Sequence, residues 1–217
     1  MDATGGAADR EALAAGGTVS GRRAGARAAR TGPRDEMKRI RIGPGDHYVT
    51  SRDDELIVTV LGSCVAACIR DPLAGVGGMN HFMLPASSTG LWGAASASMR
   101  YGNFAMERLI NDILCRGGLR GRLEVKVFGG GAMFTGGPMI GHQNADFVEA
   151  YLRAESMPIA ARHLRGLHAR HIEYLPLTGQ VMLLEMPQQD TEVARKESRF
   201  GKLLRRQPDS GPVELFD

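Results

Sequence analysis

The chain has 217 residues, of which 43% are hydrophobic and 24% charged, and its formal net charge is +3. This length suits one globular domain, and the small net charge gives little electrostatic support for nucleic-acid binding. No uninterrupted apolar segment fits a secretory signal or a membrane span, so we expect neither export nor membrane insertion.

The N-terminal segment differs sharply in composition from the rest of the chain. Residues 1–34 contain ten alanines, seven glycines, six arginines and no aromatic residue. Such a segment buries too little apolar surface to offset its ordering entropy, so we predict a disordered tail over residues 1–36. We expect a folded domain over residues 37–190. Residues 191–217 are expected to form an extension that packs on the domain or is partly mobile.

A hairpin is predicted directly after the first buried strand. Leu56–Leu61 is rich in β-branched residues, which favours a strand, and the bend at Gly62 and Ser63 ends it. Val65–Arg70 and Val76–Leu84 read as two further strands, joined by the turn-forming residues Asp71–Gly75.

Two helices and one strand are predicted in the middle of the chain. Apolar residues at helical spacing define the buried face of the first helix: Met106, Leu109, Ile110, Ile113 and Leu114. Arg122–Phe128 alternates as a half-buried strand and runs into Gly129–Gly131, where the backbone turns sharply or approaches another segment. A second helix is expected to follow Asn144 as its cap. Its buried residues would be Phe147, Val148, Tyr151 and Leu152.

Three strands are predicted near the end, at Met157–His163, His171–Leu175 and Gln180–Met186, the last two joined by a turn. From Thr191 onward a weak helical stripe follows: Val193, Phe200, Leu203 and Leu204. Strands joined by hairpins, with two clear helices, favour an α+β domain with mixed or antiparallel sheets.

Cys64 and His81 are candidates for a reactive pair. In a tight hairpin centred on Asp71–Ala74, Arg70 faces Gly75 and Cys64 faces His81. Facing residues on one side of a sheet have Cβ atoms about 4.5–5.5 Å apart, so thiol and imidazole would interact. Backbone N–H groups at the bend would hold a developing oxyanion. Taken singly, Cys64 is also compatible with a buried structural thiol and His81 with a hydrogen-bonded core histidine.

The remaining cysteines and histidines suggest no second centre. Cys68 and Cys115 are interpreted as structural thiols. A redox pair of Cys64 and Cys68 is excluded, because i and i+4 on one strand lie about 13 Å apart. Three cysteines, an odd number, favour a reducing compartment, the cytoplasm. The other histidines lack metal-ligand spacing and Gly129–Gly131 lacks a nucleotide-binding pattern, so we predict no metal site and no cofactor.

Several motifs resemble the CheD family of chemoreceptor glutamine deamidases. They include the segments Leu61–Val65, Gly77–Pro85 and Phe128–Phe134, and Glu214–Phe216 at the end. The resemblance covers roughly residues 40–217. Two positions depart from the family pattern: Gln143 stands where an arginine is usual, and Arg165 precedes Gly166 where paired glycines are usual.

The resemblance implies a β-sandwich flanked by helices, similar to the cytotoxic necrotizing factor deamidases, with a Cys-His-Thr catalytic set. Cys64 would be the nucleophile, His81 the base and Thr59 the residue that orients it, with Gly62 and Ser63 contributing backbone N–H groups to the oxyanion. Thr59 is otherwise an ordinary strand residue. The expected partners are the helical cytoplasmic parts of methyl-accepting chemotaxis receptors and a CheC-type phosphatase. The alternative is a non-catalytic module that binds receptors or that phosphatase.

Overall fold

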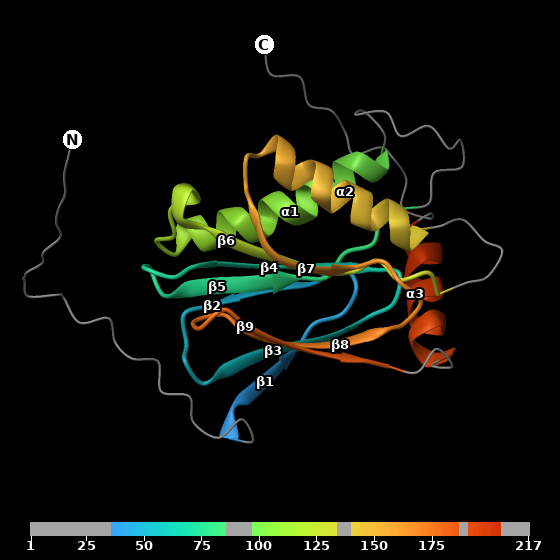
Figure 1. Cartoon of the computed structure of the whole chain (residues 1–217), viewed down its shortest axis with the longest axis horizontal. Helices are drawn as coiled ribbons and strands as arrows, with labels where there is room; N and C mark the ends of the chain where they lie inside the picture. The colour runs from blue at the N-terminus through green and yellow to red at the C-terminus, as the bar shows by residue number, and fades with distance from the viewer. Residues whose placement is uncertain (1–35, 86–96, 134–139, 187–190, 205–217) are drawn as a thin grey trace, which may run out of the picture.

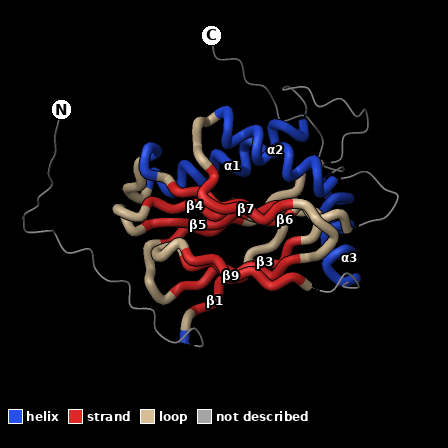
Figure 2. Tube along the Cα trace, in the orientation of Figure 1, coloured by secondary structure: helices blue, strands red, loops and turns tan. Residues whose placement is uncertain are grey.

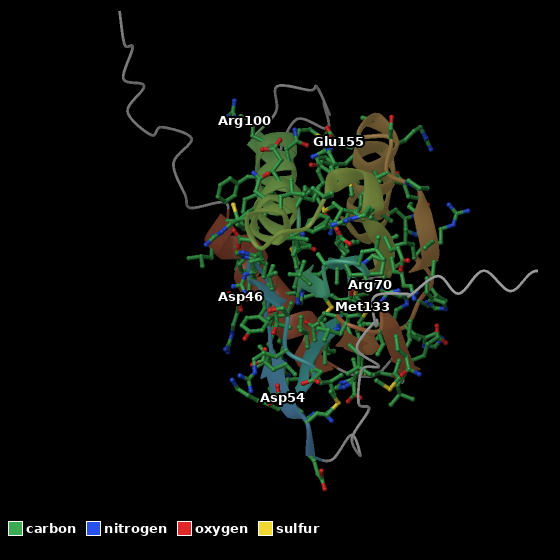
Figure 3. All side chains as sticks on the ribbon, turned by 90° about the vertical axis from the view of Figure 1, so that its left-hand side faces the viewer. Asp46, Asp54, Arg70, Arg100, Met133 and Glu155 are labelled. Atoms are coloured by element: carbon green, nitrogen blue, oxygen red, sulfur yellow. The ribbon has the colours of Figure 1, made fainter. Side chains whose placement is uncertain are left out.

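The computed structural model describes residues 36–85, 97–133, 140–186 and 191–204. Within these residues the chain forms two β-sheets stacked face to face, with helices over one of them and at one end (Figures 1 and 2). Figure 3 views the molecule at right angles, with Arg100 and Glu155 marking the helical layer and Asp54 the opposite side. The predicted α+β class with mixed sheets is therefore confirmed. The predicted tail lies almost wholly outside the described residues.

The larger sheet has the strand order β2-β5-β4-β6-β7. Its neighbouring strands are antiparallel except for β6 and β7, which run parallel. The bounds are β2 His47–Thr50, β4 Val65–Asp71, β5 Val76–Asn80, β6 Glu124–Gly129 and β7 Ile159–Leu164. Two helices cover its outer face, α1 Ala97–Cys115 and α2 Ile140–Ala154 (Figure 1).

The smaller sheet has the order β1-β3-β8-β9, with β1 parallel to β3 and the other pairs antiparallel. The bounds are β1 Lys38–Arg41, β3 Glu55–Leu61, β8 Arg170–Leu175 and β9 Gln180–Glu185. A third helix, α3 Thr191–Leu204, lies at one end of the two sheets (Figure 1). No described helix is both long enough and apolar enough to cross a membrane.

β4 is buried on both faces, and this explains its continuous apolar sequence. Val65, Ala67 and Ile69 pack in the layer beneath α1 and α2. Cys64 and Cys68 point the other way, into the layer between the two sheets. Successive side chains of a strand alternate between its faces, so both thiols lie inside the sandwich.

The hairpin of β4 and β5 has a different register from the predicted one. Asp71 pairs with Val76 and Arg70 with Gly77, two positions beyond the predicted partner. The turn keeps four residues but lies one position further along the chain, at 72–75, and there the Asp71 carboxylate accepts hydrogen bonds from the N–H groups of Leu73 and Ala74. A shift of two residues preserves the face of each side chain, so Cys64 and His81 remain on the same side. Beyond β5 the predicted strand continues only as a bridge between Phe82 and Val65.

Asn144 is not the cap of the second helix, and this prediction was wrong. The helix begins four residues earlier, at Ile140, and Asn144 lies inside it with no exposed surface. The predicted apolar face is confirmed, since Phe147, Val148 and Leu152 are buried. Asn144 is instead part of the site described below.

Candidate active site

Gly62, Ser63 and Cys64 form a short connection, the 62–64 loop, between β3 of the smaller sheet and β4 of the larger. The loop crosses from one sheet to the other at the end of the sandwich. Cys64 is fully buried at the edge of the inter-sheet layer.

Hydrogen bonds turn the three carbonyl groups of the 62–64 loop toward the body of the protein. In sequence order they accept from Gly131 N at 2.7 Å, Asn144 Nδ2 at 2.8 Å and Gly130 N at 2.7 Å. Gly129 has a φ of 111°, and a Cβ there would lie 2.2 Å from the Cys64 carbonyl oxygen. The predicted close backbone approach at the three glycines is thus confirmed, and it requires glycine.

With its carbonyls held inward, the loop directs three N–H groups outward as a cluster. All three donate to one carboxylate, that of Glu197 on α3. Gly62 N and Cys64 N bond Oε1 at 2.8 and 3.1 Å, and Ser63 N bonds Oε2 at 2.7 Å. The Ser63 hydroxyl also donates to Oε2, at 2.7 Å. This arrangement binds a negatively charged oxygen, as an oxyanion hole does.

The imidazole of His81 is held by Thr59. Thr59 Oγ1 lies 2.7 Å from His81 Nδ1 and donates its own hydrogen to the carbonyl of Ile42 at 2.9 Å. A threonine hydroxyl has a single hydrogen, so Oγ1 must accept a hydrogen from Nδ1. The neutral imidazole therefore carries its proton on Nδ1 and leaves a lone pair on Nε2. That atom is buried and has no hydrogen-bond partner among the described residues.

Thiol and imidazole meet beside the 62–64 loop. The Cys64 sulfur, a His81 ring nitrogen and a Glu197 carboxylate oxygen all lie within 4.8 Å of one another. Burial raises the pKa of the Cys64 thiol well above its usual range, and the Glu197 carboxylate adds to this shift. Burial lowers the pKa of His81 to about 4, while the charges of Glu197 and Asp46 act in the opposite direction. The pair is thus a neutral thiol next to a neutral base.

Three donors of this kind at such distances also resemble the ligands of a zinc ion. The Glu197 oxygens, however, already accept four hydrogen bonds from the 62–64 loop. A thiol, a neutral base and a carboxylate bound in an anion hole account for the positions of Cys64, His81 and Glu197. We therefore interpret the cluster through acid–base chemistry.

The structure brings together all the residues that the sequence singled out. Thr59, Gly62, Ser63, Cys64 and His81 form one buried site. Cys68 is buried in the same inter-sheet layer, Cys115 is exposed on α1, and neither forms a disulfide.

Two contributors to the site were missed, Asn144 and Glu197. Asn144 links the 62–64 loop to the segment that follows His81. Its amide nitrogen donates to the Ser63 carbonyl, and its amide oxygen accepts from Leu84 N at 2.8 Å. Glu197 carried a visible signal: it falls between Val193 and Phe200 on the apolar stripe of the C-terminal helix. A charged residue at such a position is buried with a partner.

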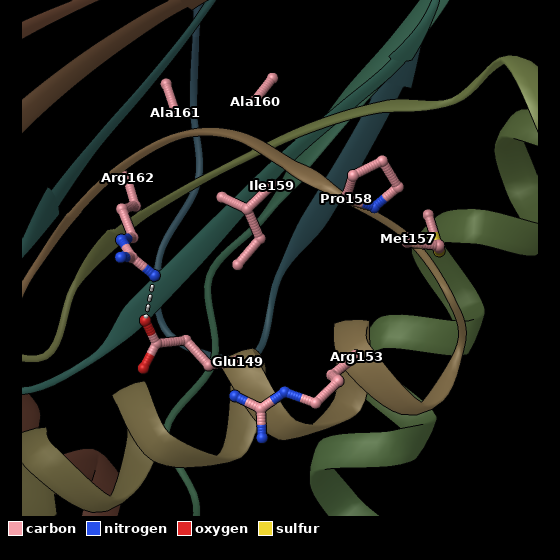
Figure 4. A pocket seen from close by; sticks show the side chains of 8 residues that line it. All are labelled: Glu149, Arg153, Met157, Pro158, Ile159, Ala160, Ala161 and Arg162. Atoms are coloured by element: carbon pink, nitrogen blue, oxygen red, sulfur yellow. Dashed lines mark hydrogen bonds and ion pairs between the residues drawn. The ribbon is translucent and has the colours of Figure 1, made fainter.

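Two hollows border the described part of the fold. One, of about 310 Å³, is lined by Thr59, His81, Val193 and Glu197 among others and so adjoins the site. The other lies between α2 and the edge strand β7 (Figure 4). Its lining includes Arg162, paired with Glu149 at 3.1 Å, but no cysteine or histidine. Of these two, only the first is a candidate path to the reactive pair.

Comparison with known proteins identifies relatives along most of the chain. A family model described as CheD chemotactic sensory transduction matches residues 83–185. A protein of Rhodopseudomonas palustris named probable chemoreceptor glutamine deamidase CheD is 60% identical over 85% of this chain and 87% of its own length. Proteins of the same name from Saccharophagus degradans and Cupriavidus metallidurans are 45% and 48% identical. They cover 82% and 83% of this chain and 84% and 86% of their own lengths.

Proposed function

Because the chain belongs to the CheD family, we propose that it is a cysteine-dependent deamidase that converts glutamine side chains of chemoreceptors to glutamate. One observation carries the assignment of residues: the unpartnered Nε2 of a buried histidine beside a thiol, under three converging N–H groups of the described chain. The family model begins at residue 83, so the roles of Cys64, His81 and Thr59 rest on this geometry.

In the proposed reaction, His81 Nε2 takes the proton of Cys64, and the thiolate attacks the carboxamide carbon of the substrate glutamine. The developing oxyanion accepts hydrogen bonds from the N–H groups of the 62–64 loop. The hydrogen bonds of the loop carbonyls hold these three donors in place, and the donors stabilise the tetrahedral intermediate once the Glu197 carboxylate no longer occupies them. The protonated imidazole then gives its proton to the leaving nitrogen, which departs as ammonia.

Hydrolysis of the resulting thioester completes the cycle. His81 withdraws a proton from a water molecule that attacks the thioester carbon, and Cys64 leaves as the thiol. The 310 Å³ hollow beside His81 and Thr59 has room for several water molecules. Thr59 acts on neither substrate nor water. It keeps the Nδ1 proton in place so that Nε2 remains the base through both halves of the reaction.

We also propose a fold relationship, a compartment and partners for this protein. A two-sheet sandwich with a Cys-His pair and a supporting hydroxyl supports kinship with the cytotoxic necrotizing factor deamidases. Three cysteines without a disulfide fit the cytoplasm, where the signalling parts of chemoreceptors lie. A CheC-type phosphatase is the proposed second partner.

The test is incubation of the purified full chain with a chemoreceptor cytoplasmic fragment, read by peptide mass spectrometry. Each converted glutamine gains about one dalton, since amide nitrogen is replaced by oxygen in the hydrolysis. We expect conversion by the wild-type protein and none by Cys64→Ala or His81→Ala. Equal conversion by Cys64→Ala and wild-type protein would contradict the proposal.

A further inference from the structure

Glu197 is an unusual residue to find in the anion hole of a hydrolase. Its side chain is 2% exposed, although α3 is otherwise a mostly exposed helix. Among the described residues, no lysine or arginine forms an ion pair with it. Burying a carboxylate is costly unless hydrogen bonds replace its hydration, and here three N–H groups and one hydroxyl do so. The 62–64 loop therefore binds this carboxylate as a ligand.

The chemistry of the occupant matches the proposed reaction. A glutamate side chain is what deamidation of a glutamine leaves behind, and Glu197 Oε1 accepts hydrogen bonds from the N–H groups of Gly62 and Cys64. We propose that α3 is an internal product mimic: it occupies the place of the substrate helix after reaction and closes the site until a receptor helix displaces it. This inference rests on the proposed function and adds how the deamidase activity is inhibited in the resting protein.

Closure acts on the nucleophile as well as on the anion hole. The Cys64 sulfur has no exposed surface. The nearby Glu197 carboxylate disfavours a second negative charge, which raises the pKa of the Cys64 thiol further. With α3 in place, neither a substrate carbonyl nor a thiolate is accommodated. Removal of the carboxylate frees three N–H donors and at the same time makes thiol ionisation easier.

The contacts of α3 also describe the helix that it would imitate. On its buried face Val193 precedes Glu197 by four residues, and Phe200 and Leu204 follow it by three and seven. Phe200 packs close to Gly45, where an added Cβ would lie 3.1 Å from its ring. A substrate glutamine bound in the same way would lie in the apolar stripe of an amphipathic helix, with apolar residues at these three positions.

A purely structural clamp is the competing explanation, in which Glu197 only stabilises the end of the sandwich. The two explanations differ in what Glu197→Gln does. A carboxamide in this position is a tethered substrate, with its carbonyl oxygen in the anion hole and its carbon beside the Cys64 sulfur. Cys64 would add to that carbon, ammonia would leave with a proton from His81, and water would release glutamate.

The decisive experiment is to purify the full-length Glu197→Gln protein and follow position 197 by peptide mass spectrometry. We expect the introduced glutamine to gain about one dalton as it becomes glutamate, and to remain unchanged in the Cys64→Ala, Glu197→Gln double variant. Glu192→Gln is the matched control, because Glu192 lies on the same helix with a 74% exposed side chain. The glutamine introduced there should stay intact. An unmodified amide at position 197, in a protein that still deamidates the receptor fragment, would overturn the proposal.

A second arm measures turnover of the receptor fragment. Glu197→Ala leaves the anion hole open, so we expect deamidation at least about tenfold faster at low substrate, where closure reduces the competent fraction most. A rate at or below the wild-type value in a folded Glu197→Ala protein would favour the structural clamp and refute the mimic. If neither protein modifies any receptor glutamine, the proposed function itself fails, a result distinct from that one.

Discussion

Thr59→Val is the substitution that tests most directly how the imidazole is held. Valine keeps the size and branching of threonine but removes the hydroxyl, which lies 2.7 Å from His81 Nδ1 and donates to the Ile42 carbonyl. The Nδ1 proton then loses its acceptor, and the tautomer with the proton on Nε2 becomes accessible. In that tautomer His81 is no longer a base toward Cys64.

The size of the effect follows from the hydrogen bond that is lost. Leaving a buried polar group without its hydrogen-bond partner costs about 1–3 kcal/mol. In the wild-type protein the same free energy favours the tautomer of His81 with its proton on Nδ1, and Thr59→Val removes that preference. Converted to a rate, it predicts a kcat that is roughly 5- to 150-fold lower. KM should stay unchanged, because Thr59 touches no substrate atom in the proposed mechanism.

The assay is deamidation of the receptor fragment at several concentrations, beside denaturant unfolding to verify that Thr59→Val remains folded. Thr59→Ser is the control, since it restores the hydroxyl and should recover most of kcat. A kcat for Thr59→Val equal to that of the wild-type protein would refute the orienting role. A rise in KM with an unchanged kcat would place Thr59 in the substrate groove instead.

Three further outcomes are expected. Asn144→Leu strands the Ser63 carbonyl and the Leu84 N–H, so the free energy of unfolding in urea should fall by about 1–3 kcal/mol for each group; an unchanged value contradicts the joining role of Asn144. Burial lowers the pKa of His81 from 6.5 to about 4, so between these pH values the imidazole is protonated in the unfolded chain and neutral in the folded chain. The free energy of unfolding should therefore fall as the pH drops from 6.5 toward 4, and it should fall less steeply in His81→Gln. Iodoacetamide should modify the exposed Cys115 first and reach Cys64 only in Glu197→Ala, as read by peptide mass spectrometry.

The strands and helices were predictable because each carries a local pattern. The β-branched run of β3, the alternation in β6 and the helical stripe of α1 each depend on neighbouring residues alone. The proximity of Cys64 and His81 on one face of the hairpin also followed from local spacing, but the register of the two strands did not. The Asp71 side chain stabilises a turn that lies one residue further along the chain by accepting hydrogen bonds from two N–H groups, and a count of residues does not reveal which turn an aspartate will build.

The missing parts of the site depend on contacts between distant segments. Asn144 is bonded to Ser63, 81 residues away, and Glu197 to Gly62, 135 residues away. The local sequence suggested a helix cap for Asn144, and Glu197 was not singled out at all. Arg165 illustrates the same limit: it adopts a φ of 67° at the position where the resemblance calls for glycine. Ion pairs to Asp146 and Glu149 fix its side chain there.

Because the 62–64 loop holds its carbonyls inward and its N–H groups outward, the thermal stability of the protein and its catalytic rate should oppose each other. Three N–H dipoles held side by side repel one another when nothing negative lies between them, so the loop is less stable empty than with a carboxylate bound. The state that resists heat best is then the state with a carboxylate bound, which is the state that cannot react. Variants selected for thermal stability should bind α3 more tightly and catalyse more slowly. Variants selected for faster catalysis should have a lower Tm.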